Sequence, residues 1–218
     1  MCFSKEASFT AAALLGLVGS LTIKSTRSKT QLFVAAIPIL FALQQFSEGV
    51  LWLQLGGSKP DPVLFSLAQK TFLMFAFFVW PIWIPFSLTF LEQIPWRRTV
   101  LLTLLAVGTA LSATNLLYFL NAPGIQVQIA SHSIQYTGNA PEQLFLYPFL
   151  VLAPWFISSA PRIWVVGAIM FAAWGVAYYL YAVNLVSVWC FFCALISSAI
   201  YWALKSSPDP VAMNTRTP

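Results

Sequence analysis

This sequence has few charged residues. Only 8% of its 218 residues are Asp, Glu, Lys or Arg, whereas 59% are hydrophobic. A soluble domain carries about 25% charged residues, so the composition excludes an ordinary soluble protein and indicates an integral membrane protein. Cysteine occurs only three times, which excludes a disulfide scaffold. The net charge of +5 is not gathered into basic stretches interleaved with aromatic residues, so we expect no nucleic-acid partner.

Long apolar segments predict an all-α fold, a bundle of seven transmembrane helices, because one span needs about 20 residues. The predicted spans cover residues 7–23, 32–55, 63–91, 99–120, 144–160, 163–183 and 185–204. We therefore expect one transmembrane domain over residues 1–205 and a disordered, proline-rich cytoplasmic tail over residues 206–218. Pro81 and Pro85 should kink the third helix, which membrane helices tolerate when neighbouring helices satisfy the freed carbonyls.

Lys and Arg are divided unequally between the two ends of the predicted bundle. One end receives eight of the eleven, and the other has only Lys5, Lys59 and Lys70. Because cytoplasmic loops carry the excess of Lys and Arg, we expect the amino terminus outside and the carboxyl terminus in the cytoplasm. The predicted location is the lipid bilayer of the inner (plasma) membrane.

One long connection, residues 121–143, joins the fourth and fifth predicted helices on the outer side. Hydrophobic and polar residues alternate from residue 125 to 129 and again after a polar turn that contains His132. Alternation with a period of two on both sides of a turn predicts a small β-hairpin. A structured loop of this length is often a lid or a binding element, and a plain interfacial loop is the alternative.

Polar side chains recur at one depth in the outer half of five predicted helices. Glu48 is the only charge in its span, and an intramembrane carboxylate marks a functional site by default. The helical rise places four other side chains at a similar depth: Lys70, Asn115, Tyr178 and Cys190. We expect them to line an outward-facing pocket for a small molecule or an ion, in which Lys70 keeps the Glu48 carboxylate charged. The alternatives are a structural contact between helices and a Lys70 that reaches the headgroups.

All three cysteines and the only histidine are predicted on the same outer side as Glu48. Cysteine and histidine suit zinc or copper, and a carboxylate can complete such a site. The leading hypothesis is a metal- or thiol-dependent site, which would be enzymatic if Glu48, His132 and Cys190 act on a substrate. Cys2, Cys190 and Cys193 are the candidate thiolate ligands, His132 a ligand or base, and Glu48 a ligand or general base. Scattered packing is the alternative, because buried cysteines usually act as small hydrophobic residues.

The pair of cysteines near the carboxyl terminus has a second interpretation. The stretch YLYAVNLVSVWCFFCALIS, residues 179–197, resembles the active-site helix of membrane thiol oxidoreductases of the vitamin K epoxide reductase type. This resemblance implies that Cys190 and Cys193 exchange electrons with a quinone. Those enzymes also use a second pair of cysteines in a loop, whereas Cys2 stands alone here.

Another resemblance covers most of the chain. The motifs that carry it are Met-Cys-Phe-Ser at residues 1–4, Ala-Ser-Phe at 7–9, Gln-Gln-Phe-Ser-Glu-Gly at 44–49 and Ser-Val-Trp-Cys-Phe-Phe at 187–192. They resemble an uncharacterised family of bacterial multi-pass membrane proteins, which implies no mechanism. The pattern of that family favours a constellation of Cys2, Glu48, His132 and Cys190 over thiol exchange.

Two rival functions remain open. A proton- or ion-coupled transporter of small solutes would use Glu48 and Lys70 as its coupled pair, although no pair of broken segments recurs in two halves of the chain. A receptor-like protein or a structural subunit of a membrane complex would instead pack its aromatic surfaces against partners.

Overall fold

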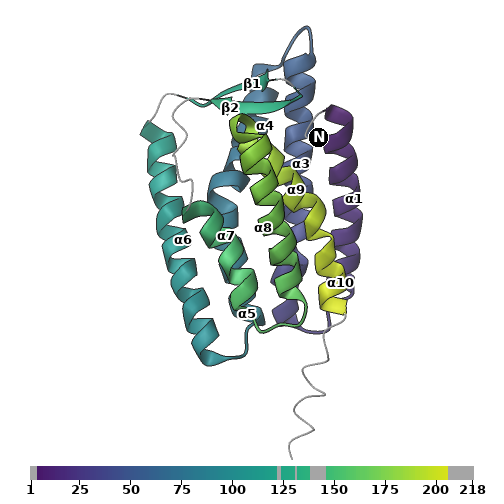
Figure 1. The fold of residues 1–218 in the computed structure, drawn as a ribbon. Helices are drawn as coiled ribbons and strands as arrows, with labels where there is room; N and C mark the ends of the chain where they lie inside the picture. The colour runs from purple at the N-terminus through teal and green to yellow at the C-terminus, as the bar shows by residue number, and fades with distance from the viewer. Residues whose placement is uncertain (1–3, 122–123, 131, 138–145, 206–218) are drawn as a thin grey trace, which may run out of the picture.

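The computed structural model describes residues 4–121, 124–130, 132–137 and 146–205. The helices run up and down along one axis, and a two-stranded hairpin lies across one end (Figure 1). The elements are α1 (Lys5–Lys24), η1 (Lys29–Gln31), α2 (Leu32–Ala35), α3 (Ile37–Gly56), α4 (Pro62–Met74), η2 (Phe75–Val79), α5 (Trp80–Leu91), α6 (Pro95–Asn121), β1 (Gln126–Ala130), β2 (Ser133–Thr137), α7 (Leu146–Ile157), α8 (Ile163–Leu180), η3 (Ala182–Asn184), α9 (Leu185–Ser197) and α10 (Ala199–Lys205).

Six helical stretches of the described residues are long and apolar enough to cross a membrane. They are Lys5–Lys24, Lys29–Gly56, Pro62–Leu91, Pro95–Leu117, Ile163–Leu180 and Leu185–Lys205. The remaining predicted span, the fifth, over residues 144–160, corresponds to α7, which has only 12 residues. A helix of that length rises about 18 Å, well below the thickness of about 30 Å of the hydrocarbon core. The seven predicted helices are therefore present, and the fifth is shorter than expected over the described residues. The predicted tail, residues 206–218, lies outside them.

The two ends of the bundle differ in charge. We call the end with β1 and β2 the hairpin end and the opposite one the far end. The chain enters α1 at the hairpin end and leaves α10 at the far end (Figure 1). Of the Lys and Arg residues in the described ranges, three lie toward the hairpin end. The other seven lie at the far end: Lys24, Arg27, Lys29, Arg97, Arg98, Arg162 and Lys205.

Two prolines interrupt the helical stretch from α4 to α5. Proline has no backbone N–H, so Pro81 and Pro85 remove the α-helical donors for the carbonyls four residues earlier, those of Phe77 and Pro81. A short π-helical turn, η2, precedes Pro81. The side-chain amide of Asn115 on α6 donates to the Phe77 carbonyl at 3.1 Å. As the sequence predicted, a neighbouring helix satisfies a carbonyl that a proline freed.

One face of α6 is adapted to this interrupted helix. Gly108, Ser112 and Asn115 lie at spacings of four and three residues and therefore share a face. A Cβ atom at Gly108 would lie 2.0 Å from the carbonyl oxygen of Pro81, so only glycine permits this approach. The Ser112 hydroxyl donates to the Phe78 carbonyl at 3.1 Å. Asn115 is therefore part of the contact between α6 and η2.

The hairpin predicted from alternating residues is confirmed. β1 and β2 pair antiparallel, with Val127 opposite Tyr136 and Ile129 opposite Ile134. Ile134 is fully buried, and the Tyr136 ring stacks on Phe72 of α4 with 4.9 Å between centroids. The hairpin therefore packs onto the ends of the helices through its own hydrophobic side chains.

Two side-chain amides hold the hairpin in place. Gln69 of α4 donates to the carbonyl of Ile125, just before β1. Asn184 of η3 donates to the carbonyl of Ala130 at 3.4 Å, where β1 ends. The first strand is thus attached at both of its ends to different helical elements.

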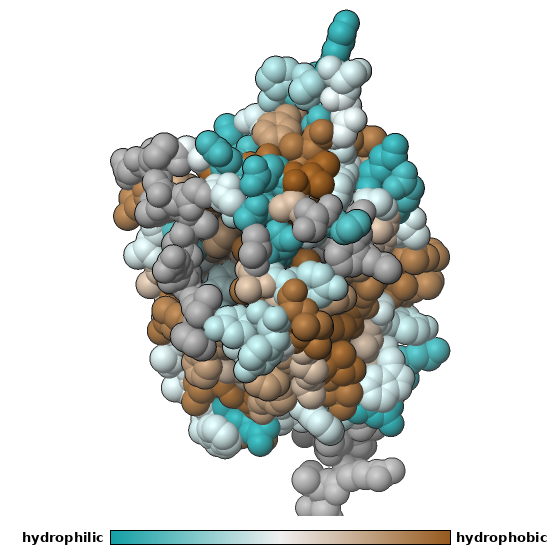
Figure 2. All heavy atoms as spheres, turned by 45° about the horizontal axis from the view of Figure 1, so that its top comes forward, coloured by the Kyte–Doolittle hydropathy of each residue, from teal (hydrophilic) through white to brown (hydrophobic). Residues whose placement is uncertain are grey.

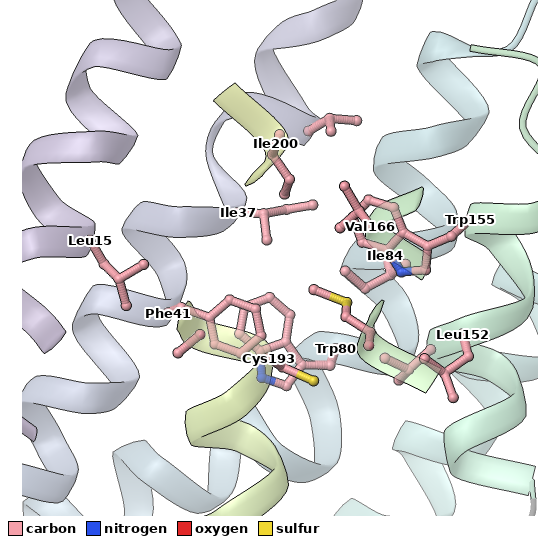
Figure 3. Close-up of a cluster of buried hydrophobic side chains, with 14 of the residues drawn as sticks. Leu15, Ile37, Phe41, Trp80, Ile84, Leu152, Trp155, Val166, Cys193 and Ile200 are labelled. Carbon is pink, nitrogen blue, oxygen red and sulfur yellow. The ribbon is translucent and has the colours of Figure 1, made fainter. Parts of the chain in front are cut away.

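Buried hydrophobic side chains form two main clusters along the bundle. The larger contains the stacked rings of Phe41 and Trp80, 3.8 Å apart, together with Trp155 and Cys193 (Figure 3). The second lies under the hairpin and includes Cys190. The two cysteines of α9, three positions apart, therefore belong to different clusters.

Candidate functional site

Glu48 lies in the middle of α3 and is fully buried. The hydroxyl of Ser187 on α9 donates to its Oε1 atom. Its other carboxylate oxygen, Oε2, is buried and has no hydrogen-bond partner. One of the two oxygens of this carboxylate is therefore left without a hydrogen bond.

Gln44 and Gln45 also have buried polar atoms without hydrogen-bond partners. The Oε1 atom of Gln44 accepts a hydrogen bond from the indole N–H of Trp80 at 2.8 Å, but its Nε2 has no partner. Neither amide atom of Gln45 meets hydrogen-bond geometry with any group, although its side chain interacts with the Glu48 carboxylate. All three side chains are fully buried. The Ser8 hydroxyl of α1, the helix packed along α3, is a further buried group without a partner.

Unpartnered atoms of this kind carry a free-energy penalty. Each buried polar group without a hydrogen bond costs about 1–3 kcal/mol, and native proteins contain few of them. Gln44, Gln45 and Glu48 together present four such atoms on neighbouring turns of one helix. This concentration points to a site where water or a bound molecule supplies the missing partners.

Local sequence explains why these side chains face inward. Gln44, Glu48 and Trp52 follow each other at four-residue spacing and share one face of α3, with Gln45 about 100° around the helix. The adjoining face carries Gly49, where a Cβ atom would lie 2.9 Å from the ring of Phe9 on α1. Glycine therefore lets α1 pack closely against α3, beside the buried side chains of Gln44, Gln45 and Glu48.

Cys190 is the predicted thiol that the fold brings to this site. It follows Ser187 by three residues and so shares the face of α9 that meets Glu48. The Gln44 side chain faces its thiol without reaching hydrogen-bond geometry. Cys193, one turn further, lies in the core with Phe41 and Trp80 (Figure 3). Both thiols are buried and free.

Among the described residues, the proposed metal ligands do not come together. No group of three or more His, Cys, Asp or Glu residues in the described part of the chain could hold a metal ion. His132 is exposed at the turn of the hairpin. Cys2 lies outside the described residues, so its predicted approach to Cys190 stays a prediction.

The predicted ion pair between Glu48 and Lys70 is wrong. Lys70 is exposed, and the described residues contain no ion pair between it and Glu48. The inward face of α4 is the one with Ala68 and Phe72. Lys70 lies about 200° around the helix from Ala68, so its side chain points away from the bundle. The prediction used the position of Lys70 along the helix and not the direction in which its side chain points.

Two further residues of the predicted pocket lie elsewhere. Asn115 is buried, but its amide bonds the Phe77 carbonyl of η2. Tyr178 is half-buried and stacks on Trp174 of the same helix, with 5.4 Å between centroids. The five side chains that were predicted to lie at one depth therefore do not line one shared pocket.

The sequence analysis missed one aromatic residue beside the thiols. Tyr147, near the start of α7, lies close enough to Cys190 and Cys193 for electrostatic interaction. Its ring meets Trp189 edge-on, with 5.7 Å between centroids. A hydroxyl-bearing aromatic in an otherwise apolar segment was the only sequence signal.

The sequence analysis also missed a second buried carboxylate. Glu92 follows α5 at the far end and is 5% exposed. It accepts hydrogen bonds from the backbone of Gln93 and Ile94, and from both the backbone and the hydroxyl of Ser159. Burial by itself would raise the pKa of Glu92, but these hydrogen bonds outweigh it and hold the pKa below the usual value for glutamate. A dipeptide Leu-Glu at a helix end offers no sign of this role.

Comparison with known proteins supports one of the two resemblances. The sequence model of the Family of unknown function (DUF6629) matches residues 1–215. No curated protein and no solved structure matches the chain. The expected relationship to an uncharacterised family thus agrees with the match, and the resemblance to vitamin K epoxide reductase-type enzymes receives no support.

Proposed function

This chain belongs to the DUF6629 family of unknown function, and from its structure we propose that it is an integral membrane protein that binds a small polar solute inside the bilayer. The site is the buried stripe of Gln44, Gln45 and Glu48. The observation that carries the proposal is the set of four unpartnered polar atoms on these three side chains. A packed helix contact would leave this cost uncompensated, whereas a bound solute supplies the missing hydrogen bonds.

The outer surface of the bundle supports the membrane assignment. Large hydrophobic side chains such as Leu17, Phe149 and Phe171 are more than half exposed. In Figure 2, hydrophobic residues cover much of the flanks, and hydrophilic residues gather toward the two ends. Water disfavours exposed apolar surface of this kind, and lipid tails accommodate it.

The far end has the features of a cytoplasmic membrane interface. Trp96, Trp164 and Trp202 are exposed there, and tryptophan is enriched at such interfaces. The guanidinium of Arg97 lies 5.2 Å from the centroid of the Trp96 ring, and that of Arg162 lies 4.9 Å from the Trp202 ring. Together with the excess of basic residues, this favours a cytoplasmic far end and a hairpin end outside the cell.

The solute would enter from the hairpin end. Trp52 lies one turn beyond Glu48 on α3, is half-buried, and has an indole N–H without a partner. It belongs to the hydrophobic cluster that contains Cys190 and Tyr136 of the hairpin. A solute that passes the hairpin therefore meets Trp52 first and the Glu48 site next.

The two native thiols of α9 test whether the site admits polar molecules. Detergent-purified protein is treated with iodoacetamide, a small neutral polar reagent, and alkylation of each cysteine is followed by tandem mass spectrometry. Cys190 borders the site and Cys193 lies in the core, so we expect Cys190 to react at least about tenfold faster. Equal, slow reaction of both thiols would show a dry site and refute the proposal.

A metal- or thiol-dependent reaction is a second candidate function. It is favoured by Cys190, whose thiol shares the Ser187 face next to the Glu48 carboxylate. These two residues are suitable zinc ligands, and a structural site needs four. Metal analysis of the purified protein and of Cys190→Ser and Cys2→Ser variants tests this candidate. Bound zinc that is lost in both variants would support the metal-dependent reaction, and a metal-free parent protein would exclude that reaction.

A further inference from the structure

We propose that the solute is a small organic amine that also carries an oxygen acceptor, as an amino alcohol does. Its ammonium group would bind Glu48 in exchange for the carboxyl proton. This inference rests on the proposed solute site and adds the chemical class of the ligand. It follows from the charges around Glu48 and from the mixture of unpartnered donors and acceptors.

No described side chain supplies a charge that pairs with Glu48, and a cationic group that acts on it electrostatically is the amino-terminal amine, which lies outside the described residues. Cys190 is the titratable group that α9 directs toward it, and Lys70 of α4 is exposed. The only charged residues early in α1, Lys5 and Glu6, are exposed and pair with each other at 3.7 Å. α5 faces the site through Trp80, which is uncharged. An unpaired buried carboxylate is strongly disfavoured, so Glu48 either keeps its proton or requires a cation.

The neighbouring amides narrow the kind of cation. The indole of Trp80 can only donate, so it fixes Oε1 of Gln44 as the acceptor and leaves the Nε2 donor unpartnered. Gln45 adds a donor and an acceptor, and Glu48 adds the acceptor Oε2. A bare metal ion would bind the oxygens and leave the Gln44 donor unsatisfied. A solute with an ammonium group and a hydroxyl oxygen satisfies both kinds of atom.

The binding step is an exchange that conserves charge. The carboxyl group of Glu48 loses its proton to water, and the incoming ammonium group donates N–H bonds to the resulting carboxylate. Such charge-assisted hydrogen bonds are about twice as strong as neutral ones. The site is neutral before and after the exchange, so no unpaired charge is buried at either stage. Binding of one amine therefore releases about one proton.

Ethanolamine is the probe for this exchange. Isothermal titration calorimetry of the purified protein in two buffers of different ionisation enthalpy measures both affinity and proton release. We expect binding with release of about one proton, and at least about tenfold weaker binding to Glu48→Gln. Glu92→Gln, which removes the other buried carboxylate, is the matched control and should bind as the parent does. Ethylene glycol and sodium chloride replace the probe in parallel titrations.

Each result has a distinct meaning. Ethylene glycol that binds as well as ethanolamine would show a neutral ligand, and sodium that binds as well would show a metal-ion site. Either outcome overturns the amine proposal and leaves the solute site in place. The same holds if ethanolamine does not bind while iodoacetamide still modifies Cys190 selectively. Loss of that selectivity would instead refute the proposed function itself.

Discussion

Glu48 and Glu92 are both buried carboxylates, yet their surroundings differ. Glu92 accepts four hydrogen bonds and joins the connection after α5 to Ser159 after α7. Glu48 accepts one, from Ser187, and its second oxygen has no partner. The protein supplies hydrogen-bond partners for both oxygens of the Glu92 carboxylate, and these bonds stabilise the fold. The Glu48 carboxylate keeps one oxygen without a partner, as the proposed binding site requires.

The position of each residue in its helix explains this difference. Glu92 follows the end of α5, where the next backbone N–H groups are not used by a helix and can donate to a carboxylate. Glu48 lies inside α3, where the backbone N–H groups are already committed to helical bonds. A carboxylate inside a helix must therefore find side chains of other helices or a ligand. Burial alone does not distinguish structural from functional carboxylates, whereas the source of their hydrogen bonds does.

The largest expected effect is the loss of stability in Glu92→Ala. This change leaves several donors of two connections without their acceptor, and hydrogen bonds to charged groups are worth about 1.5–3 kcal/mol each. Because these bonds act as one group, we expect a total loss of about 3 kcal/mol in the free energy of unfolding. Denaturant unfolding in detergent, followed by tryptophan fluorescence, measures it. A loss as small as that of Glu48→Gln would remove the contrast between the two sites.

Acidification should remove the contribution of Glu92 to the stability of the fold. The pKa of Glu92 is lower in the folded than in the unfolded protein, so its stabilisation is present above the unfolded value of about 4.3. It is lost as the pH falls through the folded value. We therefore expect the difference in stability between the parent and Glu92→Gln to shrink below about pH 4. A difference that stays constant from pH 7 to pH 3 would contradict the assigned hydrogen bonds.

Gln69→Ala tests access to the Glu48 site. The variant removes the hydrogen bond to the Ile125 carbonyl, which is worth about 1 kcal/mol, and loosens one end of β1. We expect alkylation of Cys190 by iodoacetamide to become about fivefold faster, while Cys193 stays slow. Gln54→Ala, on the same end of the bundle but bonded to Asp61, serves as the control. An equal effect of both variants would mean that the hairpin does not limit access.

Glu48→Gln should have the smallest effect on stability. The substitution keeps the size of the side chain and removes a group whose second oxygen has no protein partner. We expect a change below about 0.5 kcal/mol in the absence of ligand, in the range of ordinary substitutions. Denaturant unfolding of Glu48→Gln and Glu92→Ala under identical conditions measures both losses in the free energy of unfolding. A loss of about 3 kcal/mol would instead identify Glu48 as a structural residue like Glu92.

Much of the architecture could be predicted because its signals are local. Apolar length predicted the helices, and alternation around His132 predicted the hairpin that β1 and β2 form. The prolines of α5 predicted a neighbour that would satisfy freed carbonyls, which Asn115 does for Phe77. α7 is shorter than the predicted span 144–160, because the polar pair Ser158 and Ser159, followed by Pro161, comes directly after its last residue, Ile157.

The site could be predicted only in part. Glu48 stood out because a single charge in an apolar helix is visible in the sequence. The directions of Lys70 and Tyr178 depended on which face of each helix turns inward, and the estimate from depth alone ignored this. The inward face of α4 is already suggested by the spacing of Ala68 and Phe72, so the error for Lys70 could have been avoided.

The apolar helices, with one carboxylate inside them, are predictable from the sequence because hydrophobicity and helical periodicity act within a few turns. The partners of that carboxylate depend instead on tertiary packing. Ser187 is 139 positions away from Glu48, and Trp80 is 36 positions away from Gln44. No local pattern encodes such pairs, because they arise when separate helices pack. The oxygen that remains without a partner, and with it the proposed site, is a property of that packing.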